Sequence, residues 1–279
     1  MPSLGTPKTL RTAVLSTLFA LGPTDELLVQ VSGSEITKVL DKVQDSRLRV
    51  FFSPKPMKVF EALNTLISEA RGTFIARMDA DDICLPGRFQ AQLWFLERNK
   101  LDFVFSNAIL FGRSVKPLGF VPQPPIKLNH EESGLYLAFS NPFVHPTMLA
   151  RRSALESLSG YSDLAAEDYD LWVRAWTSGF RFSKMAFYGV LYRVHPLQVT
   201  RHPGFKKLAL NEQKFSSSVV DLEKQLVSEG LIEPGLNLKD VAVQSLKTRS
   251  LIQRMLFSVA VRRVLTFGAK KAQGTHWKA

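Results

Sequence analysis

The strongest constraint on the fold is the alternation of short β-rich runs and amphipathic runs over the first 111 residues. β-branched and aromatic residues gather in four short runs, and apolar residues recur at helical spacing between them. The strands are expected at residues 27–31, 48–52, 73–78 and 101–111, and the first helices at 35–43 and 59–70. Such an alternation predicts an α/β fold, in which a mostly parallel sheet is covered by helices.

Three aspartates, Asp79, Asp81 and Asp82, directly follow the apolar run 73–78. Ligands bind at the carboxyl ends of the strands in open α/β sheets. Carboxylates this close repel one another unless a cation lies among them, and their hard oxygens suit Mg²⁺ or Mn²⁺. Such an ion can neutralise a departing diphosphate. The alternative is an acidic turn that caps a helix beginning at Pro86.

A second acidic run, Glu167-Asp168-Tyr169-Asp170, opens a helix predicted over residues 167–178 and ended by Gly179. Two strands are expected after it, around 181–185 and 190–194. The amino end of a helix favours ionised carboxylates, which suits Asp168 as a base that removes a proton from a hydroxyl. The alternative is that Asp168 is a plain N-cap.

Two histidines and one arginine are further candidates for the same site. His145 lies between the two acidic runs, and Arg193 and His195 lie beyond the second. His195 can complete a metal shell or contact a phosphate, and Arg193 can offset phosphate charge. The alternative for both histidines is a structural role.

The net charge of +11 is concentrated toward the carboxyl end. From Val241 onward the chain has eight lysines and arginines and no Asp or Glu, with apolar residues between them. This pattern is typical of a basic amphipathic helix on an anionic membrane surface, and a solvated cationic face packed on the domain is the alternative. No nucleic-acid motif accompanies the charge, so a nucleic-acid partner is not expected.

The run at residues 12–21 has the outline of a short secretory signal but is interrupted by Thr12, Ser16 and Thr17. Its apolar residues recur at helical spacing, which predicts a helix packed on the sheet. Cys84 is the only cysteine, so there is no internal disulfide. No apolar stretch reaches the roughly 18 residues of a membrane span. A cytoplasmic protein, peripheral at the inner face of the cytoplasmic membrane, is expected.

Taken in order, these motifs resemble the family 2 glycosyltransferases, which have the Rossmann-related GT-A fold. The resemblance covers about residues 10–200. It rests on Ala70–Asp82, Pro86, Arg88, Phe89, His145-Pro146-Thr147, Arg151-Arg152-Ser153, Gly160-Tyr161, Glu167–Trp172, Arg174, Gly179 and Tyr192–His195.

The resemblance implies an inverting transfer of a sugar from a nucleotide-diphosphate sugar, most commonly a UDP-sugar, in cell-surface glycan synthesis. It implies a divalent cation, Mn²⁺ or Mg²⁺, and a glycan or lipid-linked acceptor. The site residues it implies are Asp79, Asp81 and Arg77 at the donor, Asp81 and His195 at the metal, Asp168 as catalytic base, and Asp82, Glu167, His145 and Arg193 as further candidates.

The amino-terminal part departs from this family. Residues 1–8 lack the usual first apolar strand, which predicts an empty central position in the sheet. Val31 and Ser32 stand where the family has an Asp pair. A start further upstream and a relative with weakened turnover are both open explanations.

Two domains are expected: a GT-A domain over residues 1–205, and a helical, basic carboxyl-terminal extension over 206–279. The Pro-rich stretch 116–127 is expected to be a loop.

Two other functions remain as alternatives to a glycosyltransferase: a non-catalytic binding protein of the same fold, and a basic peripheral-membrane adaptor.

Overall fold

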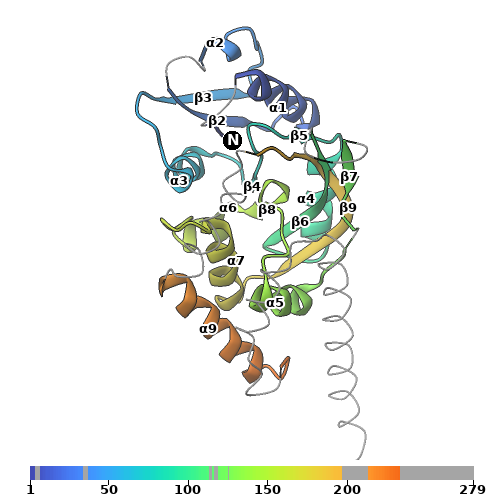
Figure 1. Ribbon diagram of the computed structural model, residues 1–279. Helices are drawn as coiled ribbons and strands as arrows, with labels where there is room; N and C mark the ends of the chain where they lie inside the picture. Colours follow the sequence, from blue (N-terminus) through green and yellow to red (C-terminus); the bar gives the residue numbers. More distant parts are fainter. Residues whose placement is uncertain are drawn as a thin grey trace, which may run out of the picture.

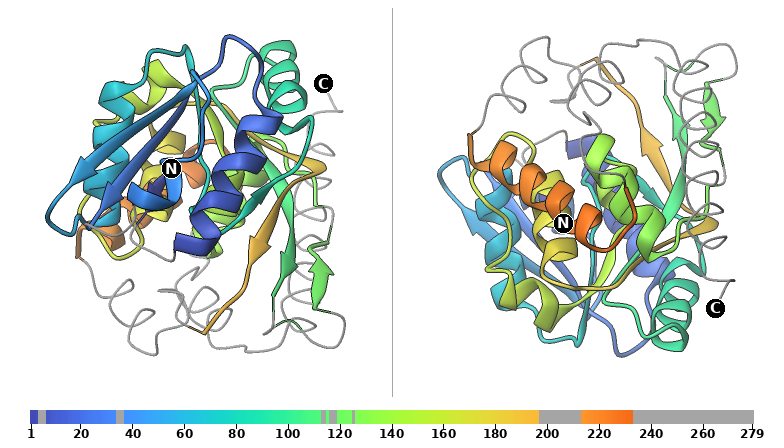
Figure 2. Two further views of the ribbon diagram at one scale, coloured as in Figure 1. Left: turned by 90° about the horizontal axis from the view of Figure 1, so that it is seen from above. Right: turned by 90° about the horizontal axis from the view of Figure 1, so that it is seen from below.

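The computed structural model describes residues 1–3, 7–33, 37–112, 115, 119–124, 126–196 and 213–232. Two sheets with helices packed around them form an α/β fold, as predicted. In Figure 2 (left) the blue amino-terminal strands lie on one side of the molecule and the strands of the later half on the other. In the described part, no helix is long and apolar enough to cross a bilayer.

The amino-terminal sheet has three parallel strands in the order β1-β2-β3. They are β1 (Pro2–Ser3), β2 (Leu27–Ser32) and β3 (Leu48–Ser53). Helix α1 (Pro7–Ala20) buries Leu10, Val14 and Leu18, which confirms the expected helix on the sheet. The short helix α2 (Thr37–Leu40) covers only part of the range predicted for it.

The central position predicted to be empty is partly filled. Pro2 and Ser3 pair with Gln30 and Val31 of β2, and the amino group of Met1 donates to the carbonyl of Leu28. The prediction of an empty position was therefore wrong for residues 1–3, because backbone pairing needs no apolar side chains.

The second sheet has the order β4-β8-β6-β9-β5, with β7 beside β6. β6 and β9 run parallel, and the other pairings are antiparallel. The strands are β4 (Phe74–Ala76), β5 (Ile83–Cys84), β6 (Phe103–Phe111), β7 (Phe120–Pro122), β8 (Leu149–Arg151) and β9 (Phe182–Arg193).

Two predictions in this region were wrong. The separate strands expected at 181–185 and 190–194 form the single strand β9, because irregular pairing near Asn107 lets one strand follow β6 throughout. β7 lies in the stretch expected to be a loop, where its backbone continues the sheet beyond β6.

Six further helices and a 3₁₀ turn belong to the described part of the chain (Figure 1), and the two over 59–69 and 167–177 lie near their predicted ranges. The helices are α3 (Val59–Glu69), α4 (Arg88–Arg98), α5 (His130–Phe139), α6 (Arg152–Ser157), α7 (Glu167–Thr177) and α9 (Gln213–Ser228), with the 3₁₀ turn η1 (His145–Thr147). Gly179 follows α7 with φ of +82°, as expected for its end. α3 ends earlier than predicted, at Glu69, because Ala70 turns to extended backbone.

An aromatic core joins α7 to the second sheet. The ring of Phe105 on β6 stacks on Phe143 at 3.9 Å and meets Trp172 of α7 edge-on at 4.9 Å. Leu222 and Leu226 of α9 are fully buried in the same core, and α9 lies against α7 and α5 (Figures 1 and 2). The division near residue 205 stays a proposal, and the predicted basic helix after Val241 lies outside the described residues.

Replacing Gly160 by alanine should destabilise the fold more than the same change at Gly179. Both glycines have positive φ, where alanine costs about 1–2 kcal/mol. A β-carbon at Gly160 would also overlap Oδ1 of Asn64, whereas at Gly179 nothing lies within 4 Å. Urea unfolding of the two variants measures the difference. Equal losses of stability would show that the loop at Gly160 relaxes freely.

Candidate active site

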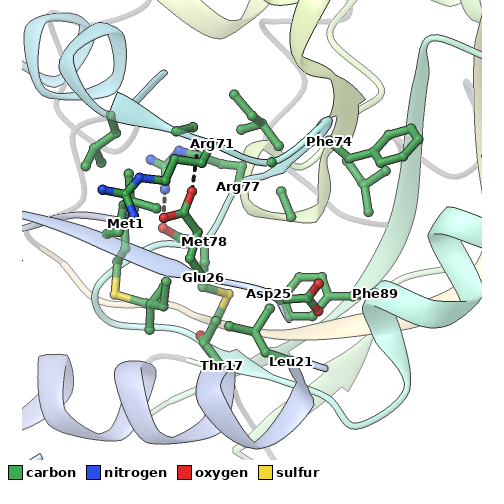
Figure 3. Close-up of a pocket in the computed structure, with 18 of the residues that line it drawn as sticks. Met1, Thr17, Leu21, Asp25, Glu26, Arg71, Phe74, Arg77, Met78 and Phe89 are labelled. Carbon is green, nitrogen blue, oxygen red and sulfur yellow. Dashed lines mark hydrogen bonds between the residues drawn. The ribbon is translucent and has the colours of Figure 1, made fainter. Parts of the chain in front are cut away.

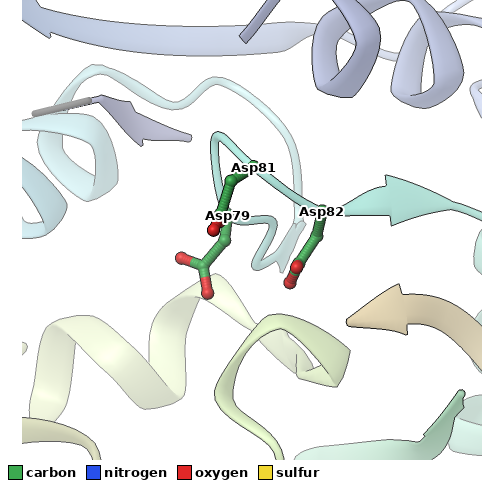
Figure 4. Close-up of side chains that lie close together, drawn as sticks. All are labelled: Asp79, Asp81 and Asp82. Carbon is green, nitrogen blue, oxygen red and sulfur yellow. The ribbon is translucent and has the colours of Figure 1, made fainter. Parts of the chain in front are cut away.

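The acidic turn leaves β4 as a loop whose carboxylates converge. Asp79, Asp81 and Asp82 each offer an oxygen, and these oxygens all lie within 4.8 Å of one another. Figure 4 shows the three side chains pointing to the same side of the loop, away from α1. Helix α4 begins at Arg88 after Gly87 and has no side-chain cap, so the capping alternative, with a helix from Pro86, was wrong.

Two arginines hold the two ends of this loop. Arg88 is fully buried and donates to the carbonyl oxygens of Arg77 (2.9 Å) and Met148 (3.2 Å). At the other end, the backbone N–H of Arg193 donates to Oδ1 of Asp82 at 2.7 Å, and its Nε donates to the carbonyl of Asp81 at 2.7 Å. The loop therefore has a fixed backbone between β4 and β9.

The electrostatics of the turn fit a divalent cation. Burial, followed by repulsion from Asp79 and Asp81, raises the pKa of Asp82 well above its usual range. Burial and Asp79 also raise the pKa of Asp81, against the opposing effect of His195, whose Nε2 lies 3.2 Å from Oδ2 of Asp81. Oδ2 of Asp82 is buried without a hydrogen-bond partner. An unpaired oxygen among crowded carboxylates is what a hard cation would satisfy, so these residues fit Mn²⁺ or Mg²⁺.

Asp168 lies at the start of α7 but does not cap it, because the N-cap is Ala166. Its Oδ1 accepts the backbone N–H of Tyr169 at 2.7 Å, and its Oδ2 accepts Nδ2 of Asn141 at 3.0 Å. The N-cap alternative was therefore wrong. These contacts fix the direction of the carboxylate.

The two neighbouring acids of α7 differ in protonation. Burial raises the pKa of Asp168 to about 6, and hydrogen bonds from Tyr169 and Asn141 and the charge of Arg77 oppose the rise. Burial and repulsion by Asp168 raise the pKa of Glu167 to about 8. The pKa of Glu167 lies above that of Asp168, and the ionised form of Asp168 accepts hydrogen bonds from Tyr169 and Asn141, so Asp168 is the carboxylate placed to accept a proton.

Arg77 and Tyr192 place both acidic motifs in one electrostatic environment. Arg77 is buried and forms an ion pair with Asp79. Its positive charge opposes the rise that burial causes in the pKa values of Glu167 and Asp168. Burial raises the pKa of Tyr192, and the negative charges of the aspartate turn and of Asp168 raise it further. The structure thus brings together Arg77, the three aspartates, Glu167, Asp168, Arg193 and His195.

His145 lies against Tyr161 and Trp172 rather than against the carboxylates. Its Nε2 lies 2.9 Å from the hydroxyl of Tyr161, and its ring meets Trp172 edge-on. Burial, followed by the charge of Arg77, lowers the pKa of His145 well below its usual value. Its contacts are those of a neutral packing residue.

Two residues at the loop over 141–143 had no role in the sequence interpretation. Asn141 lies four residues before the His145-Pro146-Thr147 motif, and only the fold brings its amide to Asp168. Lys184 on β9 is 5% exposed, and its Nζ donates to the carbonyl of Pro142 at 2.9 Å. A lysine in a strand normally indicates a solvated face, so no sequence signal could have found it.

A cavity of about 740 Å³ lies between β2 and β4 (Figure 3). Its lining includes Leu27, Leu28, Phe74 and Ala76, and excludes the three aspartates. It is the unfilled remainder of the central sheet position, because β1 pairs only with Gln30 and Val31. Arg77 and Met78, which directly precede Asp79, also line the cavity, so it adjoins the acidic site.

The fold and site define a class of protein: an α/β domain with an aspartate turn after a strand and a buried carboxylate at the start of a helix. The family model for "Glycosyl transferase family 2" matches residues 1–159, more than half of the chain. The chain therefore belongs to glycosyl transferase family 2, and it is a glycosyltransferase. Glu167, Asp168, Arg193 and His195 lie beyond the matched span.

Individual proteins agree with the family. The chain is 26% identical over 178 residues to the O-antigen biosynthesis glycosyltransferase WbnJ of Escherichia coli, covering 61% of this chain and 68% of WbnJ. It is 26% identical over 170 residues to the E. coli UDP-Glc:alpha-D-GlcNAc-diphosphoundecaprenol beta-1,3-glucosyltransferase WfaP, covering 61% of this chain and 64% of WfaP. The structure of S. aureus TarS 1–349 in complex with UDP-GlcNAc aligns with a TM-score of 0.62 and 17% identity, covering 90% of this chain and 76% of that one. The TarS likeness shows that the fold is GT-A.

Proposed function

We propose that the protein transfers a hexose from a UDP-sugar to a hydroxyl of a lipid-diphosphate-linked saccharide in cell-surface polysaccharide synthesis. The observation that carries this proposal is the shared environment of the aspartate turn and Asp168 around Arg77. A nucleotide diphosphate needs positive charge, and a hydroxyl acceptor needs a base. WfaP, named for a UDP-Glc donor and a diphosphoundecaprenol-linked acceptor, supports the choice of substrates.

Asp81 and His195 would hold a divalent cation, with Asp79 and Asp82 beside it, and the cation would neutralise the departing diphosphate. Arg77 would keep Asp79 oriented toward the donor through their ion pair. Arg193 fixes the turn through Asp82 and the Asp81 carbonyl, and so keeps the carboxylates converged.

Asp168 would accept the proton of the acceptor hydroxyl as its oxygen attacks the anomeric carbon, while the bond to the diphosphate breaks. Attack opposite the leaving group inverts the configuration in one displacement. Glu167, mostly protonated near neutral pH, adds little negative charge beside the base.

The transfer rate should fall as the pH drops below about 6. Asp168 has a pKa of about 6 and accepts a proton only when ionised, so each further pH unit should cost about tenfold. The measurement is kcat/KM between pH 4.5 and 9 at saturating Mn²⁺, which keeps the aspartate turn loaded. A rate that stays constant down to pH 4.5 would be inconsistent with Asp168 as the base.

The function is tested with UDP-Glc, UDP-Gal and UDP-GlcNAc, each with a synthetic GlcNAc diphosphate that carries an alkyl chain. We expect UDP release that requires acceptor and Mn²⁺, with a β-linked product from an α-linked donor by NMR. If the folded protein binds these compounds without turning any of them over, the non-catalytic binding alternative takes its place.

The lipid-linked acceptor also suggests where the protein acts. We propose peripheral association with the cytoplasmic membrane face, supported by the basic composition after Val241. Flotation with anionic vesicles, compared between the full chain and one ending at residue 240, tests this association.

A further inference from the structure

We propose that Asn141 is a positioning residue for Asp168, and that Lys184 fixes the loop from which Asn141 acts. The inference deepens the proposed function and rests on Asp168 being its base. It starts from the hydrogen bond between Nδ2 of Asn141 and Oδ2 of Asp168, at 3.0 Å.

The orientation of the Asn141 amide is determined by its own loop. The backbone N–H of Phe143 lies 3.0 Å from Oδ1 of Asn141. A backbone N–H can only donate, so the amide oxygen must face Phe143. The amide nitrogen must then face Asp168, where it can only donate. The contact therefore favours the ionised form of Asp168, because a donor stabilises a carboxylate.

The loop is held to the sheet at two points. The buried ring of Phe143 stacks on Phe105 of β6 at 3.9 Å. The ammonium of Lys184 on β9 donates to the carbonyl of Pro142 at 2.9 Å, although it is 5% exposed and burial lowers its pKa to about 8. A buried ammonium is costly. This cost is consistent with a role in fixing the residue next to Asn141.

Apart from Arg77, the ionisable side chains that interact with Asp168 remain protonated while it ionises, because each of them has a higher pKa. Glu167 and Tyr169 come from α7, Tyr161 from the segment before α7, and Tyr192 from β9. Arg77, after β4, supplies positive charge. Beside Arg77, the groups that favour the ionised carboxylate are the backbone N–H groups of Asp168 and Tyr169, which no side-chain change removes, and the Asn141 amide. Asn141 is thus the point at which the base can be tuned.

The test follows the Asp168 carboxyl directly, by ¹³C NMR of protein labelled at the aspartate side-chain carboxyl carbon, with the signal assigned by its loss in Asp168→Asn. Asn141→Ala removes the donor, and the Asp168 titration midpoint should rise by about one pH unit. Asn141→Asp keeps an acceptor for the Phe143 N–H but replaces the donor by a carboxylate, so the midpoint should rise further. Lys184→Met should raise it by less than Asn141→Ala.

Asn141→Asp is nearly isosteric, so it tests the proposal even if Asn141→Ala or Lys184→Met does not fold. An unchanged midpoint in folded Asn141→Asp would overturn the role of Asn141, and an unchanged midpoint in folded Lys184→Met would overturn that of Lys184. The titration needs no substrate. Failure of the proposed function would instead appear as undiminished transfer by Asp168→Asn, whatever the midpoints are.

Where turnover is measurable, the acidic limb of kcat/KM should move upward with the NMR midpoint in each variant. A purely structural role would lower the rate equally at every pH and leave the limb in place.

Discussion

Asp168→Asn is expected to lower the transfer rate by about a thousandfold and to leave UDP-sugar binding nearly unchanged. An amide of the same shape cannot accept the proton of the acceptor hydroxyl, and general-base catalysis typically contributes about 10²–10⁴-fold. The aspartate turn forms the donor site in this proposal, and the hydrogen bonds described for Asp168 go to Asn141 and Tyr169 rather than to that turn. The measurements are kcat with the best donor, and UDP-sugar affinity by calorimetry.

Glu167→Gln is the matched control for this substitution. Glu167 lies next to Asp168 on α7 but is mostly protonated near neutral pH, so a neutral amide should change the rate only a few-fold at pH 7. If Glu167→Gln abolishes transfer and Asp168→Asn does not, the base has been assigned to the wrong carboxylate.

Asp81→Ala should remove the Mn²⁺ dependence of transfer and lower the rate at least about a hundredfold. A bound cation stabilises the charge of the departing diphosphate by several kcal/mol, and each 1.4 kcal/mol corresponds to about tenfold. UDP binding should also weaken and lose its response to Mn²⁺. The measurements are initial rates and UDP titrations over a range of Mn²⁺ concentrations.

Asp163→Ala is the control for loss of a carboxylate. Asp163 is 59% exposed and pairs with Lys58 at the surface, so its removal should leave rate and metal response unchanged. A variant Asp81→Ala that retains full Mn²⁺-dependent transfer would exclude Asp81 from the metal site.

The charge of the same turn should also make the stability of the fold depend on pH and on Mn²⁺. The pKa of Asp82 is raised in the fold, so its burial favours the protonated form and folding is opposed as the pH rises above the unfolded value near 3.8. Because a cation would offset this cost, Mn²⁺ should stabilise the native protein more at pH 8 than at pH 5.

The fold was predictable where elements are long and periodic. β2, β3, α3 and α7 match the ranges read from the sequence, because their apolar spacing is set by the core they face. The two- and three-residue strands β1, β5 and β8 are too short to show a pattern, and their backbones pair whatever their side chains are.

The site was predictable in its anions and not in what positions them. Crowded aspartates after a strand can be recognised in a sequence, because their mutual repulsion indicates a bound cation. The burial of Arg88 and Lys184 cannot be recognised there, because both side chains bind backbone carbonyls that come close only after folding. The contact between Asn141 and Asp168 spans 27 residues and depends on how α5 and α7 pack.

The most direct test of the central claim is anomalous diffraction from crystals soaked with Mn²⁺ and UDP. We predict a manganese peak bonded to an Asp81 carboxylate oxygen, with the UDP diphosphate on the same ion and on the side that faces Asp168. A diphosphate bound elsewhere, with no peak at the aspartate turn, would contradict it.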